Sequence, residues 1–350
     1  MKVIWHFYAN KVNMGDWASM LGIRQFLSAA ISQEIDFVDH LLLHEVTKRE
    51  VDEINRSADI VVVGGGGLWR RTDLPLGWLW NITPELLCAI RCPIVFYSIG
   101  LNKEYHRSTE FVLNQRATSG IVQAVQRAAL VGVRDYWTLD WLCNLNVCEP
   151  YLVPCPSMLL QVDNRVESVQ NDIIGLNTVP LGRIAKRNAS FALMEDLLEW
   201  VVSEGFKLRY LCHSPHPTDF SLQLQDIFPG DLVAPRNPYE LLNSYASVKM
   251  VIGMRAHSIL FAFNQNRPVF AVRYNQKCEA FMKLLGVEHY SIPWPQYRLW
   301  GAGPFTLRKV KTKIHELMNE ISEIQHSWQN YRTLYRRYNE EFAAKVASLL

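Results

Sequence analysis

Residues 251–277 read VIGMRAHSILFAFNQNRPVFAVRYNQK, a pattern that predicts a strand, a helix and a second strand in direct succession. The first strand, Lys249–Gly253, ends at a glycine, an apolar helix begins near His257, and the strand Val269–Arg273 follows. Two buried strands joined by a helix are the repeating unit of parallel sheets. The stretch therefore predicts an α/β fold.

Short apolar runs alternate with longer helical stretches through the rest of the chain, which extends the same architecture. A chain of 350 residues exceeds the size at which one core usually stops growing, so we expect two domains. Further strands are predicted at Val3–Tyr8, Asp59–Val63, Pro93–Ile99, Ala129–Val133, Asp172–Leu176 and Lys207–Cys212, and helices at 17–30, from Trp137 onward and at 192–204.

The domain boundary is expected in Gln161–Asn171, a polar stretch without a strong period. We expect two Rossmann-like domains that face each other across a cleft, residues 1–160 and 171–306. An amphipathic helical segment, residues 307–350, is expected to follow them.

This last segment carries a cluster of basic side chains at Arg308, Lys309, Lys311 and Lys313. Such a cluster is usually the solvated face of a helix. A helix that lies on an anionic membrane surface also has a basic face, so a peripheral membrane contact stays open.

Composition narrows the functional class. The net charge of +2 argues against a nucleic-acid partner, which would need a strongly basic face. The chain has no apolar run of about 18 residues, and its first apolar run is too short for a signal peptide. Seven scattered cysteines without a CxxC pair fit reduced thiols. We expect a cytoplasmic protein.

The segment DIVVVGGGGLW, residues 59–69, places Gly64–Gly67 at the carboxyl end of a buried strand, where open α/β sheets bind ligands. Glycine lets the backbone approach a ligand and lets N–H groups point at an anion. The run is neither GxGxxG nor a Walker loop, so NAD and ATP are not indicated. Gly65, Gly66 and Gly67 are predicted ligand contacts, with a tight strand-to-helix turn as the alternative.

A polar segment, NMGD at Asn13–Asp16, lies between the first strand and the next helix. Asp16 fits the N-cap of that helix, and it also fits a base that takes a proton from a substrate hydroxyl. Asn13 and Gly15 are assigned with it to an acceptor or phosphate loop.

Arg134 ends a predicted strand and is followed by Asp135. The two residues fit a surface ion pair of small value. At the mouth of a cleft, the planar guanidinium of Arg134 would be equally suited to bind a carboxylate or a phosphate.

Arg255 and His257 lie near the amino end of the helix in residues 251–277, where N–H groups and the helix dipole favour an anion. A guanidinium there suits a phosphate or carboxylate, and a histidine beside it can donate a proton near neutral pH. Lys277 is a further anion contact or a solvated lysine.

Two other segments carry open interpretations. In LWRRTDLPLGWLW, residues 68–80, Trp69 and Arg70 belong to a loop whose tryptophans stack on a sugar or bury the loop. In HSPHPTD, residues 213–219, histidines and an aspartate suggest a metal, but the prolines make a loop and a further ligand is missing. We favour a substrate-contacting loop at His213 and expect no metal.

These segments, in this order, resemble the polysaccharide pyruvyl transferase family. The resemblance covers about residues 10–290 and is carried by NMGD, DIVVVGGGGLW, the strand ending in YSIG, VRDYWTLDWL and residues 251–277. It implies a fold like that of two-domain GT-B glycosyltransferases. It also implies transfer of a pyruvyl group from phosphoenolpyruvate, a co-substrate and not a bound cofactor, onto two sugar hydroxyls as a cyclic ketal, in exopolysaccharide or cell-surface glycan biosynthesis.

By the same resemblance, Arg134, Arg255, Ala256 and His257 line the phosphoenolpyruvate site, with His257 as the acid. Many members carry an aspartate in the segment VPCPSMLL, where this chain has Cys155. The loop rich in tryptophan and arginine also departs from the family, which leaves the acceptor open between a sugar and a lipid-linked oligosaccharide at the inner face of the membrane.

Two other functions remain as alternatives. A nucleotide-sugar glycosyltransferase of the same fold would need a carboxylate for the ribose, for which Glu279 is the obvious candidate. A non-catalytic carbohydrate-binding protein would keep the fold without the chemistry.

Overall fold

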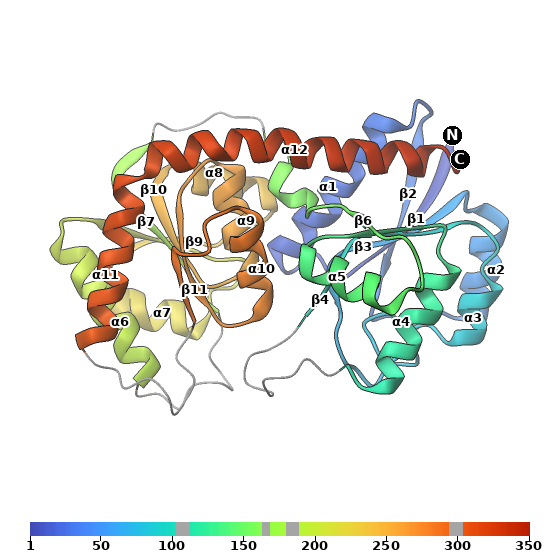
Figure 1. Ribbon diagram of the computed structural model, residues 1–350, viewed down its shortest axis with the longest axis horizontal. Coiled ribbons are helices and arrows are strands. Elements are labelled where there is room, and N and C mark those ends of the chain that lie inside the picture. Colours follow the sequence, from blue (N-terminus) through green and yellow to red (C-terminus); the bar gives the residue numbers. More distant parts are fainter. Residues whose placement is uncertain (103–112, 163–168, 180–188, 294–303) are drawn as a thin grey trace. The chain divides into compact units, whose positions relative to one another are not determined.

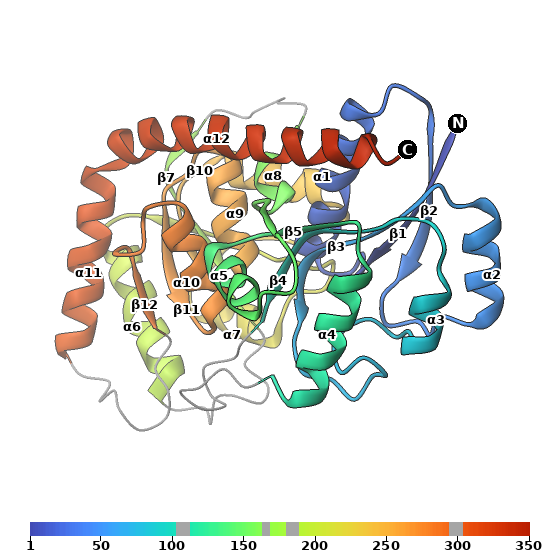
Figure 2. The ribbon, with the colours of Figure 1, turned by 45° about the vertical axis from the view of Figure 1, so that its right-hand side comes forward.

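The computed structural model describes residues 1–102, 113–162, 169–179, 189–293 and 304–350 (Figure 1). The chain forms two compact units. Unit 1 contains the described residues up to Leu160 together with Arg332–Leu350, and unit 2 contains the described residues of Gln161–Tyr331. Each unit has one parallel sheet with helices packed on it, which confirms the predicted α/β class (Figure 2).

The sheet of unit 1 has the strand order β2-β1-β3-β4-β5-β6, with every pair parallel. Its strands are β1 (Lys2–Tyr8), β2 (Ile35–Leu41), β3 (Ile60–Trp69), β4 (Ile94–Leu101), β5 (Leu130–Val133) and β6 (Tyr151–Leu152). Its helices are α1 (Met14–Ala30), α2 (Lys48–Ser57), α3 (Pro84–Ala89), α4 (Gln115–Arg127), α5 (Tyr136–Leu145) and the short η2 (Pro156–Leu159). The strand order reverses between β1 and β3, which makes their carboxyl ends the switch point of this sheet.

Alternate residues of the central strands face opposite sides of the sheet of unit 1. On one face, side chains such as Phe7 and Phe96 form a core with residues of α2, α3 and α4. On the other face, His6 contacts Arg24 of α1, and the ring of Tyr97 packs edge-on against Phe342 with 5.0 Å between centroids. Both faces are therefore covered.

The sheet of unit 2 has the order β12-β11-β10-β7-β8-β9, again all parallel. Its strands are β7 (Gln170–Asn177), β8 (Lys207–Leu211), β9 (Gly230–Val233), β10 (Val248–Gly253), β11 (Val269–Arg273) and β12 (Ser291–Pro293). Its helices are α6 (Ala189–Ser203), α7 (Asp219–Ile227), α8 (Pro238–Ala246), α9 (Ala256–Asn264), α10 (Gln276–Leu284) and α11 (Pro304–Asn319). Here the order reverses between β7 and β10, so the switch point lies at their carboxyl ends.

The last helix, α12 (Ile321–Ala347), contributes to the core of both units. In unit 2 the indole N–H of Trp328 donates to the Leu285 carbonyl at 3.2 Å. In unit 1 Asn339 is fully buried, and its Nδ2 donates to the carbonyl oxygens of Pro154 and Tyr335, each at 3.0 Å. No helix in the described part of the chain is both long and apolar enough to span a membrane.

The predicted strands agree with the observed ones to within two residues, except that β3 continues through the glycines to Trp69. Helix α1 begins at Met14, three residues before the predicted start. Its first turn is made by the polar segment that the sequence suggested as a loop.

We predict that Asn339→Ala destabilises the protein. The substitution leaves the buried Pro154 carbonyl without its donor, and an unsatisfied buried acceptor costs about 1–3 kcal/mol. Urea unfolding measures the change in the free energy of unfolding. The control is Asn330→Ala at an exposed position of the same helix, which should stay within about 0.5 kcal/mol of wild type. Equal stability of the two variants would contradict the anchoring role of Asn339.

Candidate functional site

At the switch point of unit 1, the segment after β1 leads directly into α1. Asn13 is the N-cap of the helix, and its Oδ1 accepts a hydrogen bond from the Gly15 amide at 3.0 Å. The N-cap interpretation of Asp16 is therefore wrong. Asp16 lies in the first turn, half-buried, and accepts a hydrogen bond from Asn10 Nδ2 at 2.9 Å. Its carboxylate stays at the strand ends, the position that a base for a bound hydroxyl requires.

The glycine run is part of β3 and not a strand-to-helix turn. Gly64 pairs with Tyr97 of β4 and Gly66 pairs with Ile99. A β-carbon on Gly64 would lie 2.0 Å from the Tyr97 carbonyl oxygen, so the sheet itself requires glycine there. Gly66 has φ +120°, a conformation that side chains rarely adopt. The nearest atom to a β-carbon on Gly66 is Oδ1 of Asp16 at 3.6 Å, so the two predicted contacts adjoin.

His6 lies beneath this strand and was not singled out from the sequence. Its imidazole is fully buried, with Nε2 at 2.8 Å from the Gly64 carbonyl oxygen and Arg24 Nε at 3.4 Å from Nδ1. Arginine cannot accept a hydrogen bond, so Nδ1 accepts and the Nε2–H donates to Gly64. Burial, and after it the charge of Arg24, lower the pKa of His6 to about 3. The ring is therefore neutral and fixes the start of the glycine run.

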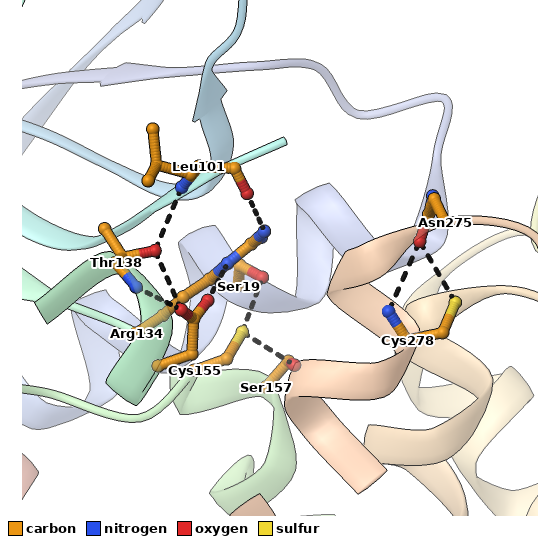
Figure 3. Close-up of polar contacts among 9 residues, drawn as sticks. Ser19, Leu101, Arg134, Thr138, Cys155, Ser157, Asn275 and Cys278 are labelled. Carbon is orange, nitrogen blue, oxygen red and sulfur yellow. Dashed lines mark hydrogen bonds and ion pairs between the residues drawn. The ribbon is translucent and has the colours of Figure 1, made fainter. Parts of the chain in front are cut away.

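Arg134 forms a buried ion pair with Asp135, so the surface-pair interpretation is wrong (Figure 3). Its Nε donates to Asp135 at 3.2 Å and its Nη2 donates to the Leu101 carbonyl at 3.1 Å. Asp135 also caps α5, because one carboxylate oxygen accepts from both the amide and the hydroxyl of Thr138 at 2.8 Å. The pair is built into the ends of β4 and β5.

Two glycines make the space that the Arg134 guanidinium occupies. A β-carbon on Gly100 would lie 2.1 Å from Arg134 Nε, and one on Gly67 would lie 3.1 Å from Nη2. The guanidinium thus extends from β5 across β4 toward β3. Asn102 borders Gly67, and its buried Oδ1 has no hydrogen-bond partner in the described part of the chain. An amide oxygen of this kind accepts from a hydroxyl.

The tryptophans after the glycine run bury their loop. Trp69, Trp78 and Trp80 have no exposed surface, and Trp69 packs against Phe96 with 6.3 Å between ring centroids. None of these three rings offers a free face to a sugar. Arg70, by contrast, is exposed.

Cys155 occupies the position at which the sequence departs from the family pattern. Its thiol is buried, 3.2 Å from the Ser19 hydroxyl and 3.2 Å from the Ser157 hydroxyl (Figure 3). Ser19 donates to the Gly15 carbonyl at 2.9 Å. The thiol therefore fills a small polar pocket between α1 and η2.

At the switch point of unit 2, the last residue of β7 and the residue after it hold Arg255. Oδ1 of Asn177 accepts from the Arg255 amide at 3.1 Å, and the Thr178 carbonyl accepts from Arg255 Nε at 3.3 Å. Arg255 is the N-cap of α9 and makes no side-chain cap bond. Neither terminal nitrogen of its guanidinium has a hydrogen-bond partner among the described residues. The fork is oriented at its base, and its donors remain available.

The other predicted donor residues of unit 2 lie on α9 and α10. Ala256 is buried in the first turn of α9, and His257 is half-buried with its ring 6.1 Å from that of Phe261. Lys277 lies in the first turn of α10, its ammonium 5.9 Å from the centroid of Tyr274. The structure thus brings Arg255, Ala256 and His257 together at one helix end and places Lys277 on the next helix.

The residues after β8 do not form a metal centre. His213 is buried against Tyr245, Asp219 opens α7 after the N-cap Thr218, and the carbonyl of His216 accepts from the Ser214 hydroxyl. Across the described ranges, no group of three or more His, Cys, Asp or Glu side chains could hold a metal ion. Of these residues, only His213 adjoins the helix end with Arg255 and His257.

Glu279 and the basic cluster of α11 have other partners. Glu279 forms an ion pair with Arg273 at 2.8 Å. Lys313 donates to the His289 carbonyl, and the Lys311 ammonium lies 5.5 Å from the ring centroid of Trp200. Part of the cluster is thus bound to unit 2 itself.

A family model described as polysaccharide pyruvyl transferase matches residues 13–276. This match spans both switch points, from the N-cap of α1 to the start of α10. No curated protein matches the chain.

Solved structures share the fold at low sequence identity. Staphylococcus aureus MnaA, solved with UDP, is 12% identical with a TM-score of 0.61, covering 94% of this chain and 90% of its own. A putative UDP-N-acetylglucosamine 2-epimerase from Listeria monocytogenes is 13% identical with a TM-score of 0.60, covering 99% and 94%. A UDP-glucosyltransferase from Polygonum tinctorium is 11% identical with a TM-score of 0.60, covering 99% and 98%. These likenesses establish the GT-B-like fold.

We predict that His6 makes the free energy of unfolding decrease as the pH falls. The unfolded chain binds a proton at His6 near the ordinary pKa of 6.5, whereas the folded protein binds it only near pH 3. Protonation therefore favours unfolding, and this contribution is lost as the pH falls from about 6.5 toward 3. Between pH 7.5 and 5, wild type should lose about 2 kcal/mol through His6.

His6→Gln keeps an N–H near the Gly64 carbonyl and removes the titration. Urea unfolding at both pH values should show a smaller loss for this variant than for wild type. His326→Gln, at an exposed position, is the control that leaves the pH dependence unchanged. The assignment of His6 fails when the two variants lose stability equally.

Proposed function

The chain belongs to the polysaccharide pyruvyl transferase family, and from that membership we propose that it transfers a pyruvyl group from phosphoenolpyruvate onto two hydroxyls of a sugar residue. The product is a cyclic ketal, and the acceptor is a sugar of a glycan, free or lipid-linked. The observation that carries the proposal is the amino end of α9, where Arg255 and His257 stand together.

This helix end has the donors that a phosphate or carboxylate requires. The first-turn amides of α9 lack a side-chain cap, and a helix amino terminus attracts negative charge. Asn177 fixes the Arg255 backbone amide, and the Thr178 carbonyl accepts from Nε and orients the guanidinium, which can then make a bidentate pair. We assign Arg255, the backbone of Ala256 and His257 to the donor. The proposal also assigns Arg134 of unit 1 and Lys277 to it.

The proposed reaction begins with proton transfer from His257 to the methylene carbon of phosphoenolpyruvate. The adjacent carbon becomes electrophilic, and a sugar hydroxyl adds to it and releases its proton to Asp16. The C–O bond to phosphate then breaks, phosphate leaves with the electron pair, and a second hydroxyl adds and loses its proton. One proton enters the methyl group and two leave the hydroxyls, so the balance is one ketal and one hydrogen phosphate.

Asp16 and the glycine run are the proposed acceptor side. The carboxylate adjoins Gly66, where the backbone carries no side chain, and Asn102 has a buried oxygen without a donor beside Gly67. A sugar presents several hydroxyl donors, which suits both oxygens.

A nucleotide-sugar donor is the second candidate, because structural relatives bind UDP or are named for UDP-sugars. Glu279, the residue that would bind a ribose, is already paired with Arg273. This pairing favours the first proposal.

We expect product from phosphoenolpyruvate in a direct assay. The protein is incubated with a set of candidate glycosides and either phosphoenolpyruvate or UDP-sugars, and the products are read by mass spectrometry. A mass gain equal to pyruvic acid less one water, with release of phosphate, supports the proposal. Transfer of a sugar from UDP would replace it with the second candidate.

We predict that His257→Ala lowers turnover by at least about a hundredfold, because general acid help typically contributes 10²–10⁴-fold. Binding of phosphoenolpyruvate should change less, since the α9 amides and Arg255 remain. Steady-state rates and calorimetric titration measure the two effects. His326→Ala is the matched control, an exposed histidine of α12. Normal turnover of His257→Ala would remove the assigned acid.

A further inference from the structure

His213, which directly follows Cys212 after β8, is a buried histidine with one unmatched nitrogen. It is 2% exposed, and its Nε2 lies 2.8 Å from the Tyr245 hydroxyl. Its Nδ1 is buried and has no hydrogen-bond partner among the described residues. A buried polar atom without a partner is costly, and native proteins retain few of them. Together with the position of His213, described next, this unmatched nitrogen is available to a ligand.

The position of His213 relates it to the helix end with Arg255. Strand β8 pairs with β7, so the residues after both strands emerge at the same edge of the sheet. The His213 ring lies 5.2 Å from the ring of Phe261, which also contacts His257. Arg255 and His257 are close enough that their charges lower the pKa of His213, after the larger effect of burial. The His213 imidazole is therefore neutral and lies beside Arg255 and His257.

The hydrogen bond with Tyr245 determines whether Nδ1 of the neutral His213 is a donor or an acceptor. Burial raises the pKa of Tyr245 well above 10, so its hydroxyl keeps its proton. When that hydroxyl donates to Nε2, the ring hydrogen must lie on Nδ1, which then becomes a donor. An anion bound at Arg255 stabilises this tautomer, because it places a donor instead of a lone pair toward negative charge.

We propose that His213 is a further donor-binding residue, whose Nδ1–H donates a hydrogen bond to an oxygen of the anion bound at Arg255 while Tyr245 holds the ring. The identity of that anion as phosphoenolpyruvate rests on the proposed function. The proposed contact of His213 with an anion does not depend on the proposed function.

Two substitutions separate the nitrogens of His213. In His213→Asn the side-chain NH₂ occupies about the place of Nδ1, so the contact with the anion is kept and the contact with Tyr245 is lost. In His213→Gln the carboxamide occupies about the place of Nε2, where its oxygen accepts from the Tyr245 hydroxyl, so only the contact with Tyr245 is kept. Calorimetric titration with phosphoenolpyruvate and with UDP, together with thermal unfolding of each variant, provides the comparison.

We expect His213→Asn to bind phosphoenolpyruvate within a few-fold of wild type and His213→Gln to bind about 10–100-fold more weakly, the loss of one hydrogen bond to a charged group. A merely structural role predicts the reverse order, because Gln keeps the internal bond. Tyr245→Phe should weaken binding less than His213→Gln, since it frees the tautomer without removing Nδ1.

The outcomes separate this inference from the proposed function. Equal binding of phosphoenolpyruvate by wild type, His213→Asn and His213→Gln overturns the role of His213 and leaves the donor assignment standing. Binding of UDP but not phosphoenolpyruvate, with Asn again stronger than Gln, supports His213 as an anion contact and overturns the donor.

Discussion

Each sheet reverses its strand order once, and this constraint decides where polar side chains can meet a ligand. In unit 1 the reversal separates the crossovers that follow β1 and β3, and in unit 2 it separates those that follow β7 and β10. Diverging connections leave a crevice at the carboxyl ends of the strands. Asp16 and the glycine run lie at the first reversal, and Arg255 with Asn177 lies at the second. The topology therefore places the proposed site residues at these two reversals.

Missing side chains are as important as present ones at the first reversal. The Arg134 guanidinium lies where Gly100 has no β-carbon, and Gly64 lets β3 approach the Tyr97 carbonyl. The glycines therefore allow close packing of the strands and also border the proposed site residues Asp16 and Arg134. His6 is neutral and donates to the Gly64 carbonyl, so it satisfies this acceptor of β3 without introducing a charge.

The sequence predicted the fold well because central strands are continuous apolar runs. Edge strands such as β2 and β9 mix polar with apolar residues and resemble loops, so they were not predicted. The roles of individual residues were harder to predict than the strands. The N-cap Asn13 and the first-turn residue Asp16 lie only three positions apart, so the sequence alone does not tell which of them caps α1. Burial of the Arg134–Asp135 pair depends on β4, which is distant along the chain. Asn177 and Thr178 are polar residues that directly follow the apolar run of β7. A polar residue after an apolar strand was the pattern that indicated other site residues, and applying it to β7 would have indicated these two.

The fold by itself does not choose between a nucleotide sugar and phosphoenolpyruvate, because folds host many chemistries and function resides in the site. The proposed donor rests instead on the groups at the second reversal. Arg255 offers an oriented fork, His257 stands one residue past Ala256, and His213 is held neutral beside them. Glu279, the carboxylate considered for a ribose, forms an ion pair with Arg273. In the proposed site, Arg255, His257 and His213 all bind the anionic part of the donor. These groups are the basis on which we propose a small phosphate ester as the donor, within a fold shared with a protein solved with UDP.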